Sequence, residues 1–216
     1  MAEERRSGQE RWFELDRLVA YSDGVFAIAM TLLVLTLEAP DLHGSDINGQ
    51  LRRYLFDQWP EFFGFVLSFV IVGRYWIAHH RLFQVVRRTD PTFIALNLVL
   101  LFFVVLLPYP TELFGDYPST RVAVIFYSAA LTVTGLSMTA LGHYAGQNHR
   151  LVDEAVSDGY ITHSLLRGLS IPVAFALAIP VAFIDVDIAK YVWLTIIPMR
   201  FYFKRRYGPI HEPFEE

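Results

Sequence analysis

The sequence predicts an all-α membrane protein with six transmembrane helices and both termini in the cytoplasm. Composition is the first reason: 54% of the 216 residues are hydrophobic, only 19% are charged, and the mean hydropathy is +0.35. Such values are typical of a multi-span membrane protein rather than a soluble domain. The second reason is the spacing of the apolar segments, and the third is the distribution of Lys and Arg between the loops.

Six apolar stretches are separated by polar loops, and together they predict a single membrane domain over residues 1–216. A hydrocarbon core of about 30 Å needs roughly 20 helical residues. The stretches are expected to be helices, because an open strand would leave unpaired backbone groups in lipid. The six expected spans cover residues 18–37, 59–78, 91–107, 122–141, 160–184 and 188–203.

The first three spans end at polar or proline-containing segments. The first stops at Glu38, where an acidic Glu-Ala-Pro-Asp run begins. The second starts near Trp59 and is followed by the His-His-Arg run that begins at His79. The third is expected to end before Pro108, which opens a Pro-Tyr-Pro run, because proline in a helix interior removes a hydrogen bond.

The last three spans differ in how often proline interrupts them. The fourth, 122–141, contains none. The fifth contains Pro172 and Pro180, which predict a kink, and the sixth is broken by Pro198. The third and sixth spans are the shortest, so the sequence defines their ends least sharply.

Positive charge sets the expected orientation. Of the 18 Lys and Arg residues, 12 fall at the two termini and in the loops after the second and fourth spans, and 4 fall in the opposite loops. Because cytoplasmic loops carry an excess of Lys and Arg, this asymmetry places both termini in the cytoplasm. The first 16 residues hold no apolar core of a signal peptide, so the first span is expected to direct insertion.

Several classes of function are disfavoured by the same composition. The net charge of −4 and the lack of a basic patch with interleaved aromatic residues argue against a nucleic-acid partner. The chain has no cysteine, which excludes disulfides, thiol catalysis and zinc-thiolate sites. None of the common hydrolase, metalloprotease or phosphate-loop motifs occurs, so the sequence predicts neither an enzyme nor a cofactor.

The first span has two distinct helical faces. At 100° per residue, Arg17 and Leu35 both lie about 20° from Ile28, whereas Ser22 and Asp23 lie more than about 100° away. A polar or charged group at the head of a membrane helix is costly without a partner, so it usually has a function. The apolar stripe consists of Arg17, Tyr21, Gly24, Ile28, Thr31, Leu32 and Leu35.

The Arg17-x3-Tyr21-Ser22-Asp23 run, followed by Gly-Val-Phe-Ala-Ile-Ala-Met-Thr-Leu-Leu-Val-Leu, resembles the signature of the transmembrane protein 175 family, which reads R-x3-F-S-D. Tyr21 stands where the family usually has Phe. The resemblance implies a potassium channel of the single-repeat, six-helix bacterial type in the plasma membrane. It also implies a homotetramer whose first helices line a central pore.

In that family the narrow points of the pore are rings of bulky apolar side chains. Carried onto this sequence, the resemblance places the constriction at Ile28, at Thr31 or Leu32, and at Leu35. Potassium ions would pass transiently at the Ile28, Thr31 and Leu35 rings. The alternative is that the stripe faces lipid or packs in the core and has no role in conduction.

The polar residues at the head of the first span are expected to form a structural network that holds it to the second and third spans. An ion-binding or catalytic role for Arg17, Ser22 and Asp23 is the alternative. His79 or His80 and Asn97 are the expected partners, and the sequence leaves the pairs open. Adjacent histidines point about 100° apart on a helix, which disfavours a shared metal ion, while proton sensing remains possible. The predicted network is Arg17, Tyr21, Ser22, Asp23, Trp76, His79, His80 and Asn97.

The function expected from these observations is passive, potassium-selective conduction through a hydrophobic constriction. The expected partners are K⁺ ions, other copies of the chain and membrane lipids. A secondary transporter or proton-coupled carrier is the alternative, although the Arg-x3-Tyr-Ser-Asp run occurs once and no internal repeat supports it. A non-conducting membrane assembly factor is the third possibility.

Overall fold

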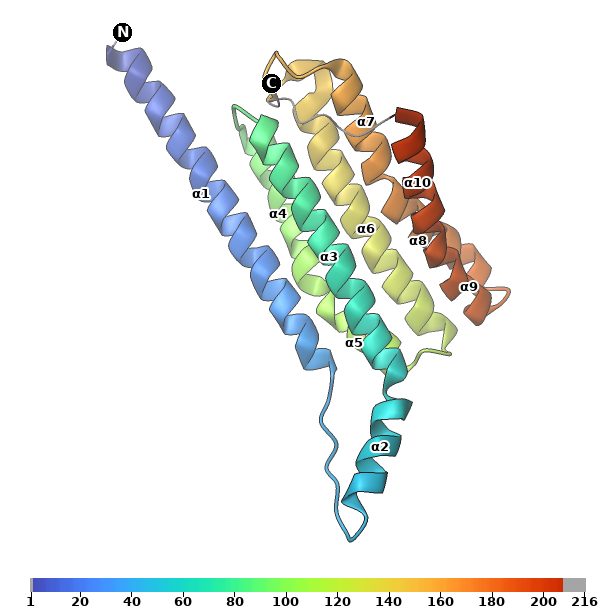
Figure 1. Cartoon of the computed structure of the whole chain (residues 1–216). Helices are drawn as coiled ribbons and strands as arrows, with labels where there is room; N and C mark the ends of the chain where they lie inside the picture. Colours follow the sequence, from blue (N-terminus) through green and yellow to red (C-terminus); the bar gives the residue numbers. More distant parts are fainter. Residues whose placement is uncertain (1, 208–216) are drawn as a thin grey trace.

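The computed structural model describes residues 2–207, and every regular element in this part of the chain is helical. Residue 1 and residues 208–216 of the expected domain lie outside it. The long helices lie side by side along one common direction (Figure 1). In chain order the elements are α1 (Ala2–Leu32), η1 (Leu33–Thr36), α2 (Ile47–Asp57), α3 (Trp59–Val85), α4 (Pro91–Leu106), α5 (Pro108–Asp116), α6 (Arg121–Gly146), η2 (Gln147–His149), α7 (Asp158–Gly168), α8 (Ser170–Ala182), α9 (Val186–Val192), η3 (Trp193–Thr195) and α10 (Ile196–Tyr207).

Within residues 2–207, five helical segments are long and apolar enough to cross a membrane. They correspond in order to the first five expected spans. The sixth, expected over 188–203, is divided within the described residues into α9, η3 and α10, none of which reaches the length of a crossing. The five segments are Leu15–Thr36, Trp59–Val85, Pro91–Asp116, Arg121–His149 and Asp158–Ala182.

The third segment continues past the point where the sequence predicted its end. Pro108 and Pro110 lie in the first turn of α5, where a missing N–H breaks no helical hydrogen bond. Leu107 keeps a helical backbone conformation, and its carbonyl accepts a hydrogen bond from Thr111 at 3.2 Å. Proline therefore marks a joint between two helices and not the end of the segment.

The fifth segment is broken between α7 and α8. Pro172 has no N–H to donate to the carbonyl of Gly168, four residues earlier, and the break falls at Leu169. The next bond is intact, from the N–H of Val173 to the carbonyl of Leu169 at 3.0 Å. The break near Pro172 agrees with the predicted kink, whereas α8 continues through Pro180, so that proline does not interrupt the segment.

The bundle is organised around α6, which packs against α3, α4, α5, α7 and α8. An aromatic cluster at its centre attaches η3 to the bundle: the ring of Trp193 lies 5.3 Å from Tyr127 and 5.4 Å from Phe175. Phe114 stacks on Tyr127 at 5.0 Å. The hydroxyl of Tyr127 is satisfied by Ser68, at 2.8 Å.

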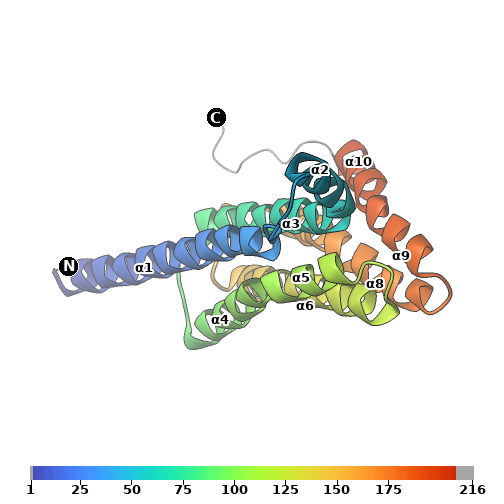
Figure 2. The ribbon, with the colours of Figure 1, turned by 90° about the horizontal axis from the view of Figure 1, so that it is seen from below.

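The first helix lies at the edge of the bundle. α1 contacts α3 and α4, and its N-terminal part projects beyond the other helices (Figure 2). α2 lies at the opposite end, below the bundle in Figure 1. A long flank of α1 is therefore left uncovered within one chain.

The loops at the α1 N-terminal end of the bundle are tied together. Val86 and Val152 form an isolated antiparallel bridge, and Arg87 Nε donates to the Asp153 carboxylate at 2.9 Å. Asp90 caps α4 by accepting from the N–H of Phe93 at 2.8 Å. Hydrogen bonding to that N–H, and then to the Tyr144 hydroxyl, holds the pKa of Asp90 below its ordinary value.

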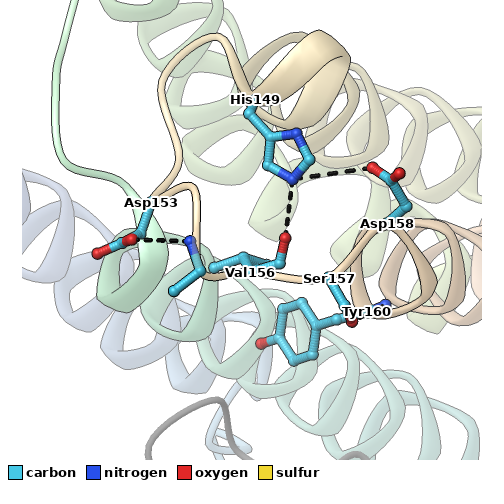
Figure 3. Close-up of polar contacts among 7 residues, drawn as sticks. His149, Asp153, Val156, Ser157, Asp158 and Tyr160 are labelled. Atoms are coloured by element: carbon cyan, nitrogen blue, oxygen red, sulfur yellow. Dashed lines mark hydrogen bonds and ion pairs between the residues drawn. The ribbon is translucent and has the colours of Figure 1, made fainter.

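The loop between α6 and α7 folds back on itself (Figure 3). Its turn places Asn148 and His149 in the left-handed region, at φ 53° and 52°. His149 Nε2 donates to the carbonyl of Val156 at 2.8 Å and lies 3.7 Å from the Asp158 carboxylate, as Figure 3 shows. These contacts fix the start of α7 over the end of α6.

Candidate functional site

One face of α1 and η1 is buried against the rest of the chain. Its members recur every three or four residues, which is the spacing of a helical stripe. Ser22 and Leu33 are fully buried, and Phe26 and Ala29 are 1% exposed. This buried face ends at Thr36, whose hydroxyl donates to the carbonyl of Leu33 at 2.8 Å. This face attaches α1 to α3 and α4, and η1 to α3 and α5.

The opposite face carries every residue predicted for the constriction. The exposed fraction of Ile28 is 59% and that of Leu35 is 70%, while Leu32 is 37% exposed. Thr31 is also exposed, and nothing lies within 4 Å of the position of a side chain at Gly24. An apolar surface of this length is available to lipid or to another copy of the chain.

Thr31 is the hydroxyl-bearing residue among them. Its Oγ1 donates to the carbonyl of Ile28 at 2.8 Å, in the helix backbone. A hydroxyl that donates to the backbone keeps its acceptor lone pairs for other groups. The exposed face therefore presents an oxygen acceptor between two bulky apolar side chains, and no carboxylate or imidazole that would serve acid–base chemistry.

A buried chain of hydrogen bonds connects α1, α4 and α3. Asn97 Nδ2 donates to Ser22 Oγ at 2.9 Å, and Ser22 Oγ donates to the carbonyl of Leu18 at 2.8 Å. His79 Nε2 lies 2.9 Å from the amide oxygen of Asn97. Because that oxygen can only accept, the proton of His79 is on Nε2. Asn97, from the centre of α4, thus forms hydrogen bonds with side chains of both neighbouring helices.

The surroundings of His79 are otherwise apolar. The ring lies 4.3 Å from that of Phe83 and 5.4 Å from that of Phe26, and it is fully buried. Its Nδ1 has no hydrogen-bond partner among the described residues. Sequence analysis did not single out these phenylalanines. The position of Phe26, one helical turn after Ser22, is the signal that could have found one of them.

Asp23 belongs to a second, more exposed group. Its carboxylate accepts from Trp76 Nε1 at 2.9 Å. The Trp76 ring stacks on His80 at 5.7 Å, and His80 contacts Gln84 through Nε2 at 3.2 Å. The predicted network is therefore two separate groups: one joins Ser22, Asn97 and His79, and the other joins Asp23, Trp76 and His80.

The two remaining residues of the predicted network are Tyr21 and Arg17, and both are exposed. Tyr21 is 56% exposed and belongs to the outer face of α1, and Arg17 is exposed one turn before it. Within residues 2–207, no cluster of three or more His, Cys, Asp or Glu side chains is placed to hold a metal ion.

Comparison with known proteins gives a consistent answer. Residues 17–108, which hold the C-terminal half of α1 together with α3 and α4, match the family model described as the endosomal/lysosomal potassium channel TMEM175. A protein named as a potassium channel in Streptomyces collinus is 32% identical over 80% of this chain and 84% of its own length. Another so named, in Chamaesiphon minutus, is 33% identical over 85% of this chain and 88% of its own length.

The chain belongs to the TMEM175 family. The family predicted from the Arg17–Asp23 run is thereby confirmed, and the protein is a multi-pass membrane protein of a channel family. The fold agrees: the crystal structure of a lysosomal potassium-selective channel TMEM175 homolog from Chamaesiphon minutus superposes with a TM-score of 0.73. That match covers 90% of this chain and 98% of the other, at 30% identity.

The animal relatives are longer and carry a different name. The endosomal/lysosomal proton channel TMEM175 of Danio rerio is 27% identical over 84% of this chain, which corresponds to 35% of that protein. This chain thus spans about a third of the animal relative and nearly all of the bacterial ones.

Proposed function

We propose that this chain is one subunit of a passive, potassium-selective channel whose pore is lined by the exposed face of α1. The single observation that carries the proposal is that Ile28, Thr31 and Leu35 lie on one uncovered face, in a chain of a channel family. The bacterial relatives named as potassium channels support K⁺ as the ion.

The pore requires several copies of the chain. One chain offers one α1, which contacts its own bundle on one side only, so an enclosed pathway needs copies around a common axis. Closed cyclic symmetry satisfies this requirement. We propose a homotetramer in the bacterial plasma membrane, with both termini in the cytoplasm. The segment from Val186 to Tyr207 would then make the sixth crossing, in pieces.

Selectivity would arise where the ion loses water. A constriction formed by bulky apolar rings excludes a hydrated ion, and K⁺ sheds its water at lower cost than Na⁺. Thr31 would replace part of that hydration through its free acceptor lone pairs. K⁺ would occupy the Ile28, Thr31 and Leu35 levels only transiently, and no cofactor is required.

The first test is ion flux into liposomes that contain the purified protein. We expect K⁺ flux to exceed Na⁺ flux, and an Ile28→Asn variant to lose this preference because a polar ring keeps water in the constriction. Ile94→Asn is the matched control, since Ile94 is a partly exposed residue of α4, away from the proposed pore. An equal loss in both variants, or no flux from folded oligomers, would contradict the proposal.

The same experiment distinguishes the alternatives. Flux that saturates with K⁺ concentration favours a carrier, whereas single-channel currents favour a pore. The name of the animal relatives makes proton conduction a second candidate. A pH-sensitive dye inside the liposomes reports it: acidification that persists without K⁺ would indicate a proton pathway.

A further inference from the structure

A cavity of about 100 Å³ lies on the side of the bundle away from α1, between α3 and the broken fifth segment. This volume is several times the roughly 10–15 Å³ that one water molecule needs. It receives side chains from four helices, α3, α6, α7 and α8. The lining residues are Arg74, Tyr75, Ile77, Ala78, Arg81, Met138, Tyr160, Ser164, Arg167, Gly168, Ser170 and Ile171.

Three arginines line this cavity, and none of the described residues that line it, between positions 74 and 171, is acidic. Arg74 and Arg81 are seven residues apart on α3, which places them on one helical face about 10 Å apart along the axis. Arg167, in the last turn of α7, lines the same cavity from the fifth segment. Like charges at short range repel, and an anion between them would remove the repulsion.

The remaining lining supplies hydroxyl groups and an apolar wall. Tyr160, Ser164 and Ser170 bring hydroxyls, and Met138 and Ile171 bring apolar surface. Arginine is the side chain best suited to phosphate, because its planar guanidinium donates two parallel hydrogen bonds to two oxygens. The Ser170 hydroxyl donates to the carbonyl of Arg167 at 2.7 Å, so Ser164 is the hydroxyl that we assign to a ligand. The combination of arginine forks, this hydroxyl and an apolar wall matches a phosphate group attached to a less polar body.

The depth of the cavity fits such a ligand. Arg81 lies one turn before the end of α3 at Val85, at the end of the bundle where the basic loops lie. Arg74 lies about 10 Å further into the bundle. Cationic side chains at this level meet the phosphate groups of a bilayer, and anionic lipids bind basic pockets between transmembrane helices on the cytoplasmic side.

We propose that this arginine pocket, defined by Arg74, Arg81, Ser164 and Arg167, binds a phosphate-bearing anion. The phosphate would lie between Arg81 and Arg167, with Ser164 as a further donor. Two sources share this chemistry: the headgroup of an anionic phospholipid and a soluble phosphate. The site is separate from the proposed pore and does not depend on it.

The experiment measures the melting temperature of the full-length protein in nanodiscs of phosphatidylcholine with increasing phosphatidylglycerol. We expect phosphatidylglycerol to raise the melting temperature, because a ligand that binds only the folded state stabilises it. In the double variant Arg81→Gln/Arg167→Gln, the phosphatidylglycerol concentration that gives half of the rise in melting temperature should increase about tenfold or more. Arg88→Gln is the control, since Arg88 is an exposed arginine outside the pocket.

A second variant tests the same proposal in case the double variant does not fold. Ser164→Glu places a carboxylate inside the pocket, so this variant should be as stable as the wild type in phosphatidylcholine alone and insensitive to phosphatidylglycerol. Inorganic phosphate, added at constant ionic strength in zwitterionic lipid, identifies the source of the anion. If it raises the melting temperature of the wild type but not of the pocket variants, the site binds a soluble phosphate. An identical response to both anions in the wild type, the double variant and Ser164→Glu would overturn the proposal.

Discussion

The two faces of the first span, formed by α1 and η1, differ little in composition but greatly in environment. Leu33 is fully buried and Leu35, two residues on, is 70% exposed. Thr36 is buried and Thr31 is exposed, although both hydroxyls donate to the backbone at 2.8 Å. Hydrophobicity alone therefore does not determine which face of a membrane helix packs against the chain and which face stays exposed. The buried face is identified by its partners on other helices, and the uncovered face by the exposure of Ile28, Thr31 and Leu35 among the described residues.

The largest expected effect separates Leu33 from Leu35. Leu33→Ala should destabilise the protein by about 2–5 kcal/mol, because it opens a cavity between η1 and its neighbours. Leu35→Ala should change stability by less than about 0.5 kcal/mol, because the side chain has few contacts within the chain. The measurement is unfolding of the detergent-solubilised protein, with K⁺ flux per folded molecule measured in parallel.

The flux should show the opposite order. If Leu35 lines the pore, its truncation widens a ring and raises flux or lowers selectivity, while Leu33→Ala leaves the selectivity of the surviving folded protein unchanged. Equal destabilisation by the two substitutions would mean that both faces of the helix are packed in the assembled state and would refute the assignment.

The next effect concerns the polar chain on the buried face. Asn97→Leu should cost about 1–3 kcal/mol, since it leaves the Nε2 proton of His79 buried without an acceptor. The triple variant Ser22→Ala/His79→Phe/Asn97→Leu removes all three polar side chains and should recover part of that loss. Yield and melting temperature measure both. A triple variant as unstable as the single one would argue against an unsatisfied donor as the cause.

Part of this arrangement could be predicted from the sequence. The periodicity of Ile28 and Leu35, and the position of Ser22 off that stripe, follow from the helix repeat alone. The all-helical fold follows from the bilayer, which leaves a single chain few other ways to pair its backbone. Membership of the family follows from the Arg17–Asp23 run.

The pairings could not be predicted, for a physical reason. Asn97 and Ser22 are 75 residues apart in sequence, and their contact depends on how α1 and α4 are rotated and shifted against each other. Asp23 could equally have met His79 or His80, yet it meets Trp76. Pro108 reads as a helix end locally, but packing of α5 against α3 and α6 keeps the segment continuous.

The two threonines provide a finer test of the comparison. Thr36→Val should cost about 1 kcal/mol, because it removes a buried hydroxyl that is satisfied by the Leu33 carbonyl. Thr31→Val keeps the shape of the side chain and should leave stability almost unchanged, while the ratio of K⁺ to Na⁺ permeability falls. Reversal potentials under mixed-ion conditions measure that ratio. A ratio unchanged in Thr31→Val would remove this hydroxyl from the selectivity mechanism.

The smallest effect concerns Asp90, which caps α4, the helix that carries Asn97. Its pKa is held below the ordinary value of about 3.9, so the carboxylate stabilises the folded state at pH values above that value. This contribution is lost as the pH falls further, through the folded-state pKa. In Asp90→Asn the amide still caps the helix but does not titrate. The melting temperature of this variant should therefore fall less than that of the wild type between about pH 5 and pH 3, the range that brackets the pKa of an ordinary Asp. Because the contacts of Asp90 are to the start of α4, to Tyr144 of α6 and to Arg150, ion selectivity should be unaffected in this variant. A change in selectivity would mean that the buried face transmits movements of α4 to the pore, and the two faces of α1 would then be coupled rather than independent.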